Sequence, residues 1–479
     1  MLTEESRKGF RSHLVRLRPR PDVLYIGQSR TLMATDLDGQ ISGKPDTGLF
    51  VHETRLLSSY RYLLQGRPPV PVALSNYEQH NWMGYYIEVP PGVRNTVDAG
   101  SGHVEQASQQ TLELRVSRHV GPGVHEDLDL TNFSQSKTKL EFVVELDADF
   151  ADVSETEGPR QQHGKITRSW ITRGGAPPAL VFDYRARHRY RHQGNVGIAR
   201  LQRGLIVRIE NASSRPSYKK GRLIFKIKLS PHQSWHACIH LIPVIEGEQL
   251  ESYYACRSFT GVHGGFDRSR ITFLAESTEF TTPGAETLEP VVLAALNQAK
   301  RDLAALRLHD LDHGPRGWTM AAGLPLYIAL FGRDTLGASW QASILGPEMM
   351  TGTLIELAQW QGSQTNHWRD EEPGRMLHEA HTGPIPSLCY DPRGRYYGSA
   401  TTSSFYPFVV SQLWHWTGDK ELIRPLIGPS LRAMAWKETR LRRGRFYEYQ
   451  TRSEQGVKNQ SWKDSGDAIV YADGSQVDA

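Results

Sequence analysis

The chain has 479 residues, which is long for a single hydrophobic core, so we expect two domains. A hydrophobic fraction of 38%, a charged fraction of 23% and a net charge of +4 are ordinary values for a globular protein. They give no strong attraction to nucleic acid or to anionic membranes. No apolar run is long enough to span a bilayer, and the first residues contain no apolar signal segment, so we expect a soluble cytoplasmic protein.

Between about residues 20 and 280, apolar and polar side chains alternate along short segments. Leu140, Phe142, Val144 and Leu146 face one way, and residues 223–229 show the same period. This alternation is typical of strands with one buried face. Because Gly, Pro, Asn and Asp turns separate many such segments, we predict an antiparallel β-sandwich over residues 1–283.

Residues 185–192 of this region form a basic tract, Arg-Ala-Arg-His-Arg-Tyr-Arg-His. Arginines with an aromatic side chain among them can follow a phosphate backbone. The flat overall charge balance favours the alternative of a solvated strand or turn.

The three cysteines, Cys238, Cys256 and Cys389, are far apart and form no Cys-x-x-Cys pattern. Isolated cysteines in odd number argue against a disulfide framework and against a zinc site. We therefore expect a reducing compartment and no metal or cofactor.

Near residue 284 the apolar period becomes helical. We predict a linker helix within residues 284–312, followed by a helical domain over residues 313–479. Its expected helices span 324–344, 349–361, 404–417 and 420–440.

Three clusters in this helical domain place acids beside aromatic side chains: Phe331–Thr335, Trp368–Pro373 and Trp462–Asp467. Eight of the eleven tryptophans also lie beyond residue 315. Aromatic faces stack on sugar rings, while carboxylates and guanidinium groups hold hydroxyls. The clusters therefore predict a sugar site.

Two other motifs fail on spacing. Gly39–Pro45 looks like a phosphate loop, but proline stands where a magnesium-binding hydroxyl is needed. His378-Glu-Ala-His381 looks like a zinc-protease helix, but its histidines are three residues apart, where four are required.

Four C-terminal motifs together resemble glycoside hydrolases of the glycogen-debranching, amylo-alpha-1,6-glucosidase type. They are Gly323–Leu336, Asp370–Glu379, Tyr396–Ser399 and Asn459–Asp467. Near the N-terminus, Tyr25-Ile-Gly-Gln-Ser and Asp46-Thr-Gly-Leu-Phe-Val-His-Glu-Thr-Arg-Leu-Leu-Ser58 resemble the domain fused to such enzymes, in the same order.

The resemblance implies an N-terminal β-sandwich followed by an (α/α)6 toroid and hydrolysis of α-glucosidic bonds with inversion. One carboxylic acid would protonate the leaving oxygen, and a second carboxylate about 6.5–9.5 Å away would activate water.

Carried onto this sequence, the resemblance makes Asp467 the general acid, with Asp464 as the alternate candidate or a hydroxyl ligand. Arg333 and Asp334 would bind hydroxyls of the terminal glucose, and Trp462 would be a stacking platform. Asp370, Glu371 and Glu379 are further candidate contacts.

Two positions depart from the family pattern. Gly466 stands where a tryptophan usually precedes the acid, and Ala400–Ser404 lacks the usual Asp and Pro. About 165 residues after residue 314 are also few for a toroid, so we expect a truncated chain that contains only its first part and lacks the general base.

The leading hypothesis is therefore an α-glucan hydrolase of debranching type, here as a fragment. The alternative is a carbohydrate-binding protein without catalysis, and a nucleic-acid binder using residues 185–192 is a third. We expect a glucan or oligosaccharide partner and no nucleic-acid or membrane partner. Linkage specificity and oligomeric state are not fixed by the sequence.

Overall fold

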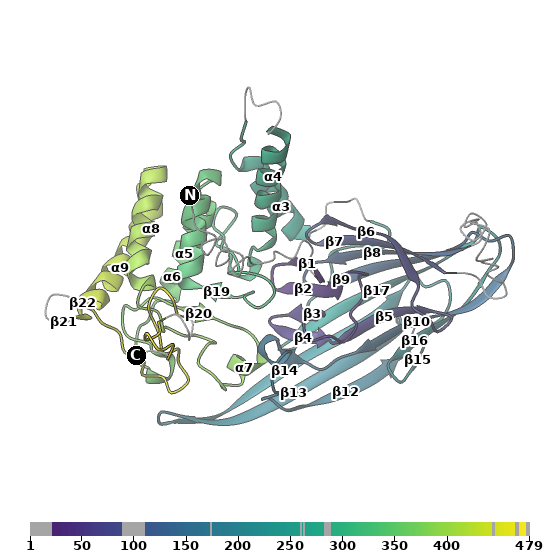
Figure 1. Cartoon of the computed structure of the whole chain (residues 1–479), viewed down its shortest axis with the longest axis horizontal. Helices are drawn as coiled ribbons and strands as arrows, with labels where there is room; N and C mark the ends of the chain where they lie inside the picture. The colour runs from purple at the N-terminus through teal and green to yellow at the C-terminus, as the bar shows by residue number, and fades with distance from the viewer. Residues whose placement is uncertain are drawn as a thin grey trace, which may run out of the picture.

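A computed structural model describes the protein over residues 22–88, 111–172, 175–258, 261, 264–281, 289–442, 446–464 and 469–475. Strands fill the first half of this chain and helices most of the second, and Figure 1 shows the two halves side by side. None of the described helices combines the length and apolar character that a bilayer crossing needs.

The largest sheet is antiparallel and runs in the order β12-β13-β14-β17-β9-β8-β7-β6, with β18 paired to β17. Its strands are β6 (Val70–Glu78), β7 (Asn81–Glu88), β8 (Leu112–Val120), β9 (Val124–Asn132), β12 (Gly164–Ile171), β13 (Ala179–His192), β14 (Asn195–Glu210), β17 (Ser234–Ile245) and β18 (Glu248–Gln249).

Two smaller antiparallel sheets accompany it. The first runs β1-β2-β3-β4-β11 and the second β15-β16-β10-β5. Their strands are β1 (Val23–Gln28), β2 (Thr31–Asp36), β3 (Gly48–Val51), β4 (Thr54–Leu57), β5 (Ser59–Leu64), β10 (Thr138–Asp147), β11 (Ala151–Asp152), β15 (Ser217–Lys219) and β16 (Arg222–Leu229).

The large sheet and the β5–β10–β16 sheet share one hydrophobic core. The alternation seen in the sequence explains this, because Phe142 of β10 and Phe225 of β16 are cross-strand partners with buried side chains. Leu128 and Leu130 of β9 meet them from the opposite sheet. The prediction of an antiparallel β region followed by a helical region is confirmed.

A buried ion pair also lies between these sheets. Arg118 and Glu126, both fully buried, are joined by a bond of 2.5 Å from Nε to Oε1. The hydroxyl groups of Tyr60 and Tyr62 donate to the same carboxylate from β5. Since a buried charge is costly unless it is fully hydrogen-bonded, this network specifies how the two sheets face each other.

The helices begin with α3 (Gly264–Glu276), which lies in the range expected to be sandwich, and α4 (Glu289–Ala305), which lies in the predicted linker. The later helices are α5 (Gly332–Gln341), α6 (Glu348–Gln359), α7 (Pro384–Ser387), α8 (Thr402–Thr417) and α9 (Lys420–Glu438). The short elements among and after them are η2 (His309–Leu311), η3 (Ala342–Leu345), η4 (His367–Arg369), β19 (Leu330–Phe331), β20 (Glu379–Ala380), β21 (Leu441–Arg442) and β22 (Phe446–Tyr447), while η1 (Val153–Glu155) follows β11.

The predicted helix over 324–344 is wrong in its first third. Residues 324–326 form a turn between Gly323 and Tyr327, which are bridged to each other. The following β19 pairs with β20, so α5 begins only at Gly332. A proline at position 325 and this long-range pairing override the helical spacing.

The two halves pack against each other through a second core. Leu32 and Phe50 of the small sheet contact buried residues of the helical part, among them Leu330 and Met376. This shared core holds β19, the start of α5 and the segment after β20 against the β region.

Candidate functional site

Arg333 stands in the first turn of α5, at a point where the chain is closely packed. The amide of Gly332 donates to the carbonyl of His378 at 2.7 Å. A Cβ atom at Gly332 would lie 2.0 Å from the carbonyl oxygen of Leu377, so only glycine fits there. The β19–β20 pairing and this contact fix where the Arg333 side chain emerges.

The Arg333 guanidinium meets the loop that carries Asp464. Its Nη2 lies 3.0 Å from Asp464 Oδ2, and Nη1 donates to the carbonyl of Ser461 at 3.4 Å. The carbon Cζ lies 5.2 Å from the centre of the Trp462 ring, a cation–π contact. Two of the sequence clusters therefore converge on one guanidinium.

Asp464 has a second partner, His378, whose Nε2 lies 3.0 Å from the same carboxylate oxygen. Burial alone would raise the pKa of Asp464, but hydrogen bonding to His378 and the charge of Arg333 outweigh it and lower the pKa to about 2. Asp464 is therefore an ionised ligand and a poor proton donor at neutral pH.

Asp334 and Trp462 are the exposed members of this group. The Asp334 side chain is 44% exposed and lies 4.0 Å from Arg333. Trp462 is 61% exposed and meets Phe405 edge-on at 6.2 Å. Both side chains contact Arg333, and an exposed carboxylate and an exposed indole are groups that can hold a hydroxyl group and a sugar ring.

Asp467, the predicted general acid, lies outside the described residues. Its role stays a prediction.

Asp370 and Glu371 lie inside the protein, each 1% exposed. Asp370 accepts hydrogen bonds from the Tyr396 hydroxyl at 2.8 Å and the Arg452 amide at 2.7 Å, while Glu371 binds Arg369 at 2.5 Å. These protein groups occupy both carboxylates. Asp370 thereby orders the loop that contains residues 451–464, while Glu371 bonds to Arg369 and to the amide of Ser363.

Three further residues extend the polar network toward the β region. Glu379 lies 3.9 Å from His378 through Oε1, and its Oε2 is 2.8 Å from His381 Nε2. The other ring nitrogen of His381 lies 2.5 Å from Oε1 of Glu53, which belongs to the turn between β3 and β4. Glu379, His381 and Glu53 thus form a hydrogen-bonded link, and Asp464 joins it through His378, which lies at ion-pair distance from Glu379 without a hydrogen bond.

The charge state of this link is set by its carboxylates. Burial alone would lower the pKa of His381, but Glu53 and Glu379 outweigh it and raise the pKa to about 10. The pKa of Glu53 is lowered: burial opposes this, and the charge of His381 with its hydrogen bond prevails. At neutral pH, His381 is therefore protonated and lies as a cation between two carboxylates.

A cavity of about 190 Å³ opens beside this link, lined by residues of both halves that include Glu53, Asp152, Tyr327, Glu379, His381 and Arg393. Ligand pockets usually have about 300–1,000 Å³. The cavity is therefore too small to hold an oligosaccharide by itself.

The sequence reasoning missed His378, His381 and Glu53 as parts of this network. The His378-Glu-Ala-His381 pattern suggests only a zinc-ligand role for its histidines, which their spacing excludes. The available signal was that His378, Glu379 and His381 lie in the same motif as the predicted acids, and that Glu53 lies in the N-terminal motif.

The basic tract of residues 185–192 docks against the helical half. His188 Nδ1 lies 2.8 Å from the carbonyl oxygen of Leu388, and its ring stacks on Tyr390 at 3.8 Å. The His192 ring stacks on Trp368 at 3.6 Å. The arginines between them are exposed. Figure 1 shows this end of the β13–β14 hairpin running below the helical part.

Comparison with solved structures gives several matches, among them two of low sequence identity. A protein assigned as a kojibiose phosphorylase, from the human microbiome, aligns with 7% identity and a TM-score of 0.41 over 86% of this chain and 66% of that chain. A galactose mutarotase-like protein from Clostridium acetobutylicum aligns with 8% identity and a TM-score of 0.24 over 47% of this chain and 95% of that one. The chain thus spans slightly less than two thirds of the first protein.

Comparison with curated proteins gives no match. Comparison with protein families gives one match, and this match does not involve the helical half. Residues 26–240, which hold most of the β region and include Glu53, match the family described as the N-terminal domain of (some) glycogen debranching enzymes.

Proposed function

We propose that this chain is part of an α-glucan-active glycoside hydrolase of the debranching type, and that Arg333, Asp334, Trp462 and Asp464 bind the terminal glucose of its substrate. The observation that carries the proposal is the contact of Arg333 with both Trp462 and Asp464. The match of residues 26–240 to a domain of some glycogen debranching enzymes supports the same substrate class from the other half of the chain.

Each residue has a distinct part in this proposal. Asp464 holds Arg333 and His378 in place as a fixed anion. The exposed carboxylate of Asp334 accepts hydrogen bonds from sugar hydroxyls, and the open face of Trp462 stacks on the ring. These contacts orient the glycosidic oxygen, which is the positioning that acid–base chemistry requires.

Asp467 is proposed as the general acid. It closes the Trp462–Asp467 motif, which also contains Asp464. The ionised state of Asp464 leaves the role of proton donor to another carboxylic acid. Hydrolysis with inversion then requires a second carboxylate as base, about 6.5–9.5 Å from the acid.

The proposal includes the architecture. Helices α5, α6, α8 and α9 pack around a common apolar core that includes Leu336, Leu354, Tyr406 and Leu426. We propose that they form the first part of an (α/α)6 toroid whose loops carry the sugar site.

A second candidate is glucan binding without hydrolysis. The pKa of Asp464 favours this candidate. Burial raises this pKa, but His378 and Arg333 lower it by more, to about 2. The acid with the best-defined position thus serves binding and not proton transfer.

Co-sedimentation of the full chain with glycogen, with free glucose measured in the same samples, tests both candidates. Binding with glucose release supports the hydrolase. Binding without release is expected of the second candidate and also of a hydrolase part without its general base, and absence of binding contradicts both candidates.

A further inference from the structure

Four metal-binding side chains meet on the large sheet, in the β half of the molecule. Cys238 of β17 lies directly opposite Asp127 of β9, and His236 lies opposite Asp129. Residues two apart on a strand face the same side, so all four point away from the hydrophobic core. The loop after β18 covers this side and adds Cys256.

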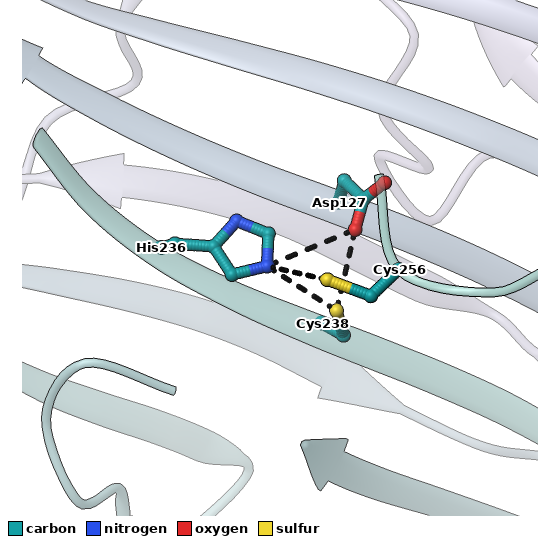
Figure 2. Close-up of side chains that lie close together, drawn as sticks. All are labelled: Asp127, His236, Cys238 and Cys256. Atoms are coloured by element: carbon teal, nitrogen blue, oxygen red, sulfur yellow. Dashed lines mark hydrogen bonds and ion pairs between the residues drawn. The ribbon is translucent and has the colours of Figure 1, made fainter. Parts of the chain in front are cut away.

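Figure 2 shows the side chains of Asp127, His236, Cys238 and Cys256 pointing toward one another. His236 Nε2 lies 3.1 Å from Cys256 Sγ and 3.3 Å from Cys238 Sγ. Asp127 Oδ1 lies 3.2 Å from Cys238 Sγ and 3.8 Å from His236 Nε2. All four ligand atoms lie within 4.8 Å of one another.

We propose that Asp127, His236, Cys238 and Cys256 bind a structural zinc ion. Zinc is held tetrahedrally by thiolate, imidazole and carboxylate ligands at about 2.0–2.3 Å. Bonds of that length place neighbouring ligand atoms roughly 3.3–3.8 Å apart, and the contacts around His236 and Cys238 are 3.1–3.8 Å. The site needs only small adjustments to close around the ion.

The groups around these four residues are those that orient zinc ligands. His236 Nδ1 lies 2.8 Å from Asp129 Oδ1, so it is the protonated nitrogen and Nε2 keeps its lone pair for the metal. His125 contacts Asp127 Oδ1 at 3.2 Å, and the amide of Arg257 donates to Oδ2 at 2.8 Å. Both fix the carboxylate.

The surrounding charge fits a dithiolate site. Zinc with two thiolates and the Asp127 carboxylate carries one net negative charge, and Asp129 adds another. Arg115 lies 2.7 Å from Asp129, and the guanidinium of Arg257 lies 3.9 Å from it. These two cations balance the two negative charges, which lowers the cost of the buried centre.

A reactive cysteine is a weaker explanation of the geometry. A thiol–histidine–carboxylate arrangement needs one sulfur, whereas here two sulfurs and a carboxylate oxygen approach the same imidazole nitrogen. Cys238 and Asp127 are also buried, with 0% and 3% exposed. Zinc binding would release the two thiol protons, because thiolate is the ligand form.

The site would fasten the connection between the two halves of the chain. Cys256 follows the last strand of the large sheet and precedes α3, so the ion would tie this connection to β9 and β17. Four protein ligands leave no open position, as in structural zinc sites. The proposal departs from the expectation based on cysteine spacing, because the ligands come from three separate segments.

Metal analysis of the full chain tests the proposal. Purified from zinc-supplemented medium without chelators, the protein should contain about one zinc per chain. Cys256→Ser and Cys238→Ser should lose it. Cys389→Ser is the matched control, because Cys389 is the cysteine outside the cluster, and it should keep the zinc. Asp129→Asn keeps all four ligands and should weaken zinc binding by about 10–100-fold in chelator competition.

Cobalt in place of zinc gives a readout that does not depend on how well the variants fold. The wild-type chain should show the intense visible bands of a tetrahedral site and a sulfur-to-cobalt charge-transfer band. A folded wild-type protein that binds neither metal would overturn the proposal. So would a Cys256→Ser variant with unchanged zinc, or a thiol titration under denaturing, non-reducing conditions that shows Cys238 and Cys256 joined in a disulfide.

Discussion

The guanidinium of Arg333 lies 3.0 Å from the carboxylate of Asp464, 131 residues further along the chain. The same guanidinium stacks on Trp462. Neither contact is needed to begin α5. Together, the Arg333–Asp464 and Arg333–Trp462 contacts define a surface between α5 and the loop over residues 451–464. This surface is the basis of the proposed sugar site.

Replacing Asp464 with Asn should weaken both the site and the fold. The carboxylate holds Arg333 and His378, and loss of hydrogen bonds to charged groups costs about 1.5–3 kcal/mol. Urea denaturation should show a decrease of this size in the free energy of unfolding at pH 7, and maltooligosaccharide binding should weaken. Asp473→Asn, at an exposed aspartate, is the control and should change neither.

The Asp464 effect should depend on pH in a defined direction. His378 and Arg333 outweigh burial and lower the folded pKa to about 2, and the unfolded pKa is about 3.9. The stabilisation is therefore present above about pH 4 and is lost as the pH falls toward 2. Equal stability differences between wild type and Asp464→Asn at pH 7 and pH 2.5 would contradict this account.

Asp467→Asn should separate chemistry from binding. If Asp467 is the general acid, the change removes the proton needed by the leaving oxygen and should abolish glucose release while glycogen binding persists. Turnover and binding should be measured on the same preparation, with Asp473→Asn again as the control. The test requires a preparation whose wild-type form releases glucose. If the Asp467→Asn variant then released glucose at the wild-type rate, Asp467 would have no part in the mechanism.

The Glu53–His381 pair should stabilise the junction of the two halves. Glu53→Gln removes one partner of a buried ion pair and should cost about 3–5 kcal/mol. The exposed His163 provides the control variant His163→Gln, which should have the stability of wild type.

The same pair predicts a loss of stability at alkaline pH. Burial opposes protonation of His381, but Glu53 and Glu379 prevail, and the folded pKa is about 10 against about 6.5 when unfolded. The stabilisation is complete below about pH 6.5 and declines as the pH rises to 10. Denaturation of wild type and His381→Gln should give curves that converge at alkaline pH, and a constant difference up to pH 10 would exclude the charged pair.

His192→Ala should loosen the docking of the β13–β14 hairpin. It removes the stack on Trp368 and the contact of Nε2 with the carbonyl oxygen of Cys389 at 2.6 Å. We expect a loss of about 1–2 kcal/mol in the free energy of unfolding. Arg191→Ala, at the exposed neighbouring position, should have little effect. If Arg191→Ala lowered the free energy of unfolding more than His192→Ala does, a role of this tract in binding an external polyanion would be favoured.

The apolar periodicity of the sequence predicted the strands and helices that form from local sequence alone. Strict alternation at Leu140–Leu146 gave β10, and helical spacing gave α6, α8 and α9 to within a few residues. The pairing of Phe331 with Glu379 depends on a partner about 50 residues away, which helical spacing does not reveal. The α3 segment lies between β18 and α4 and has no clear apolar stripe, so periodicity did not identify it.

The candidate site was also predictable only in part. Arg333, Trp462 and Asp464 belong to recognisable motifs and do meet. Asp370 and Glu371 belong to a similar motif, but both are buried and hydrogen-bonded to protein groups, Asp370 to the 451–464 loop and Glu371 to Arg369 and Ser363. Glu53 joins the network only through the packing of two halves, and the cluster around Cys238 forms through strand register and the loop that brings Cys256. Neither relation is encoded in residue spacing.

Isothermal titration of the full chain with maltoheptaose tests the central claim most directly. Wild type should bind, Trp462→Ala and Arg333→Met should each weaken binding about tenfold or more, equivalent to about 1.4 kcal/mol, and Trp416→Ala should bind as wild type, because Trp416 is a similarly exposed tryptophan on α8. No maltoheptaose binding by the folded wild-type chain, or equal affinity in all four proteins, would contradict a sugar site at Arg333 and Trp462.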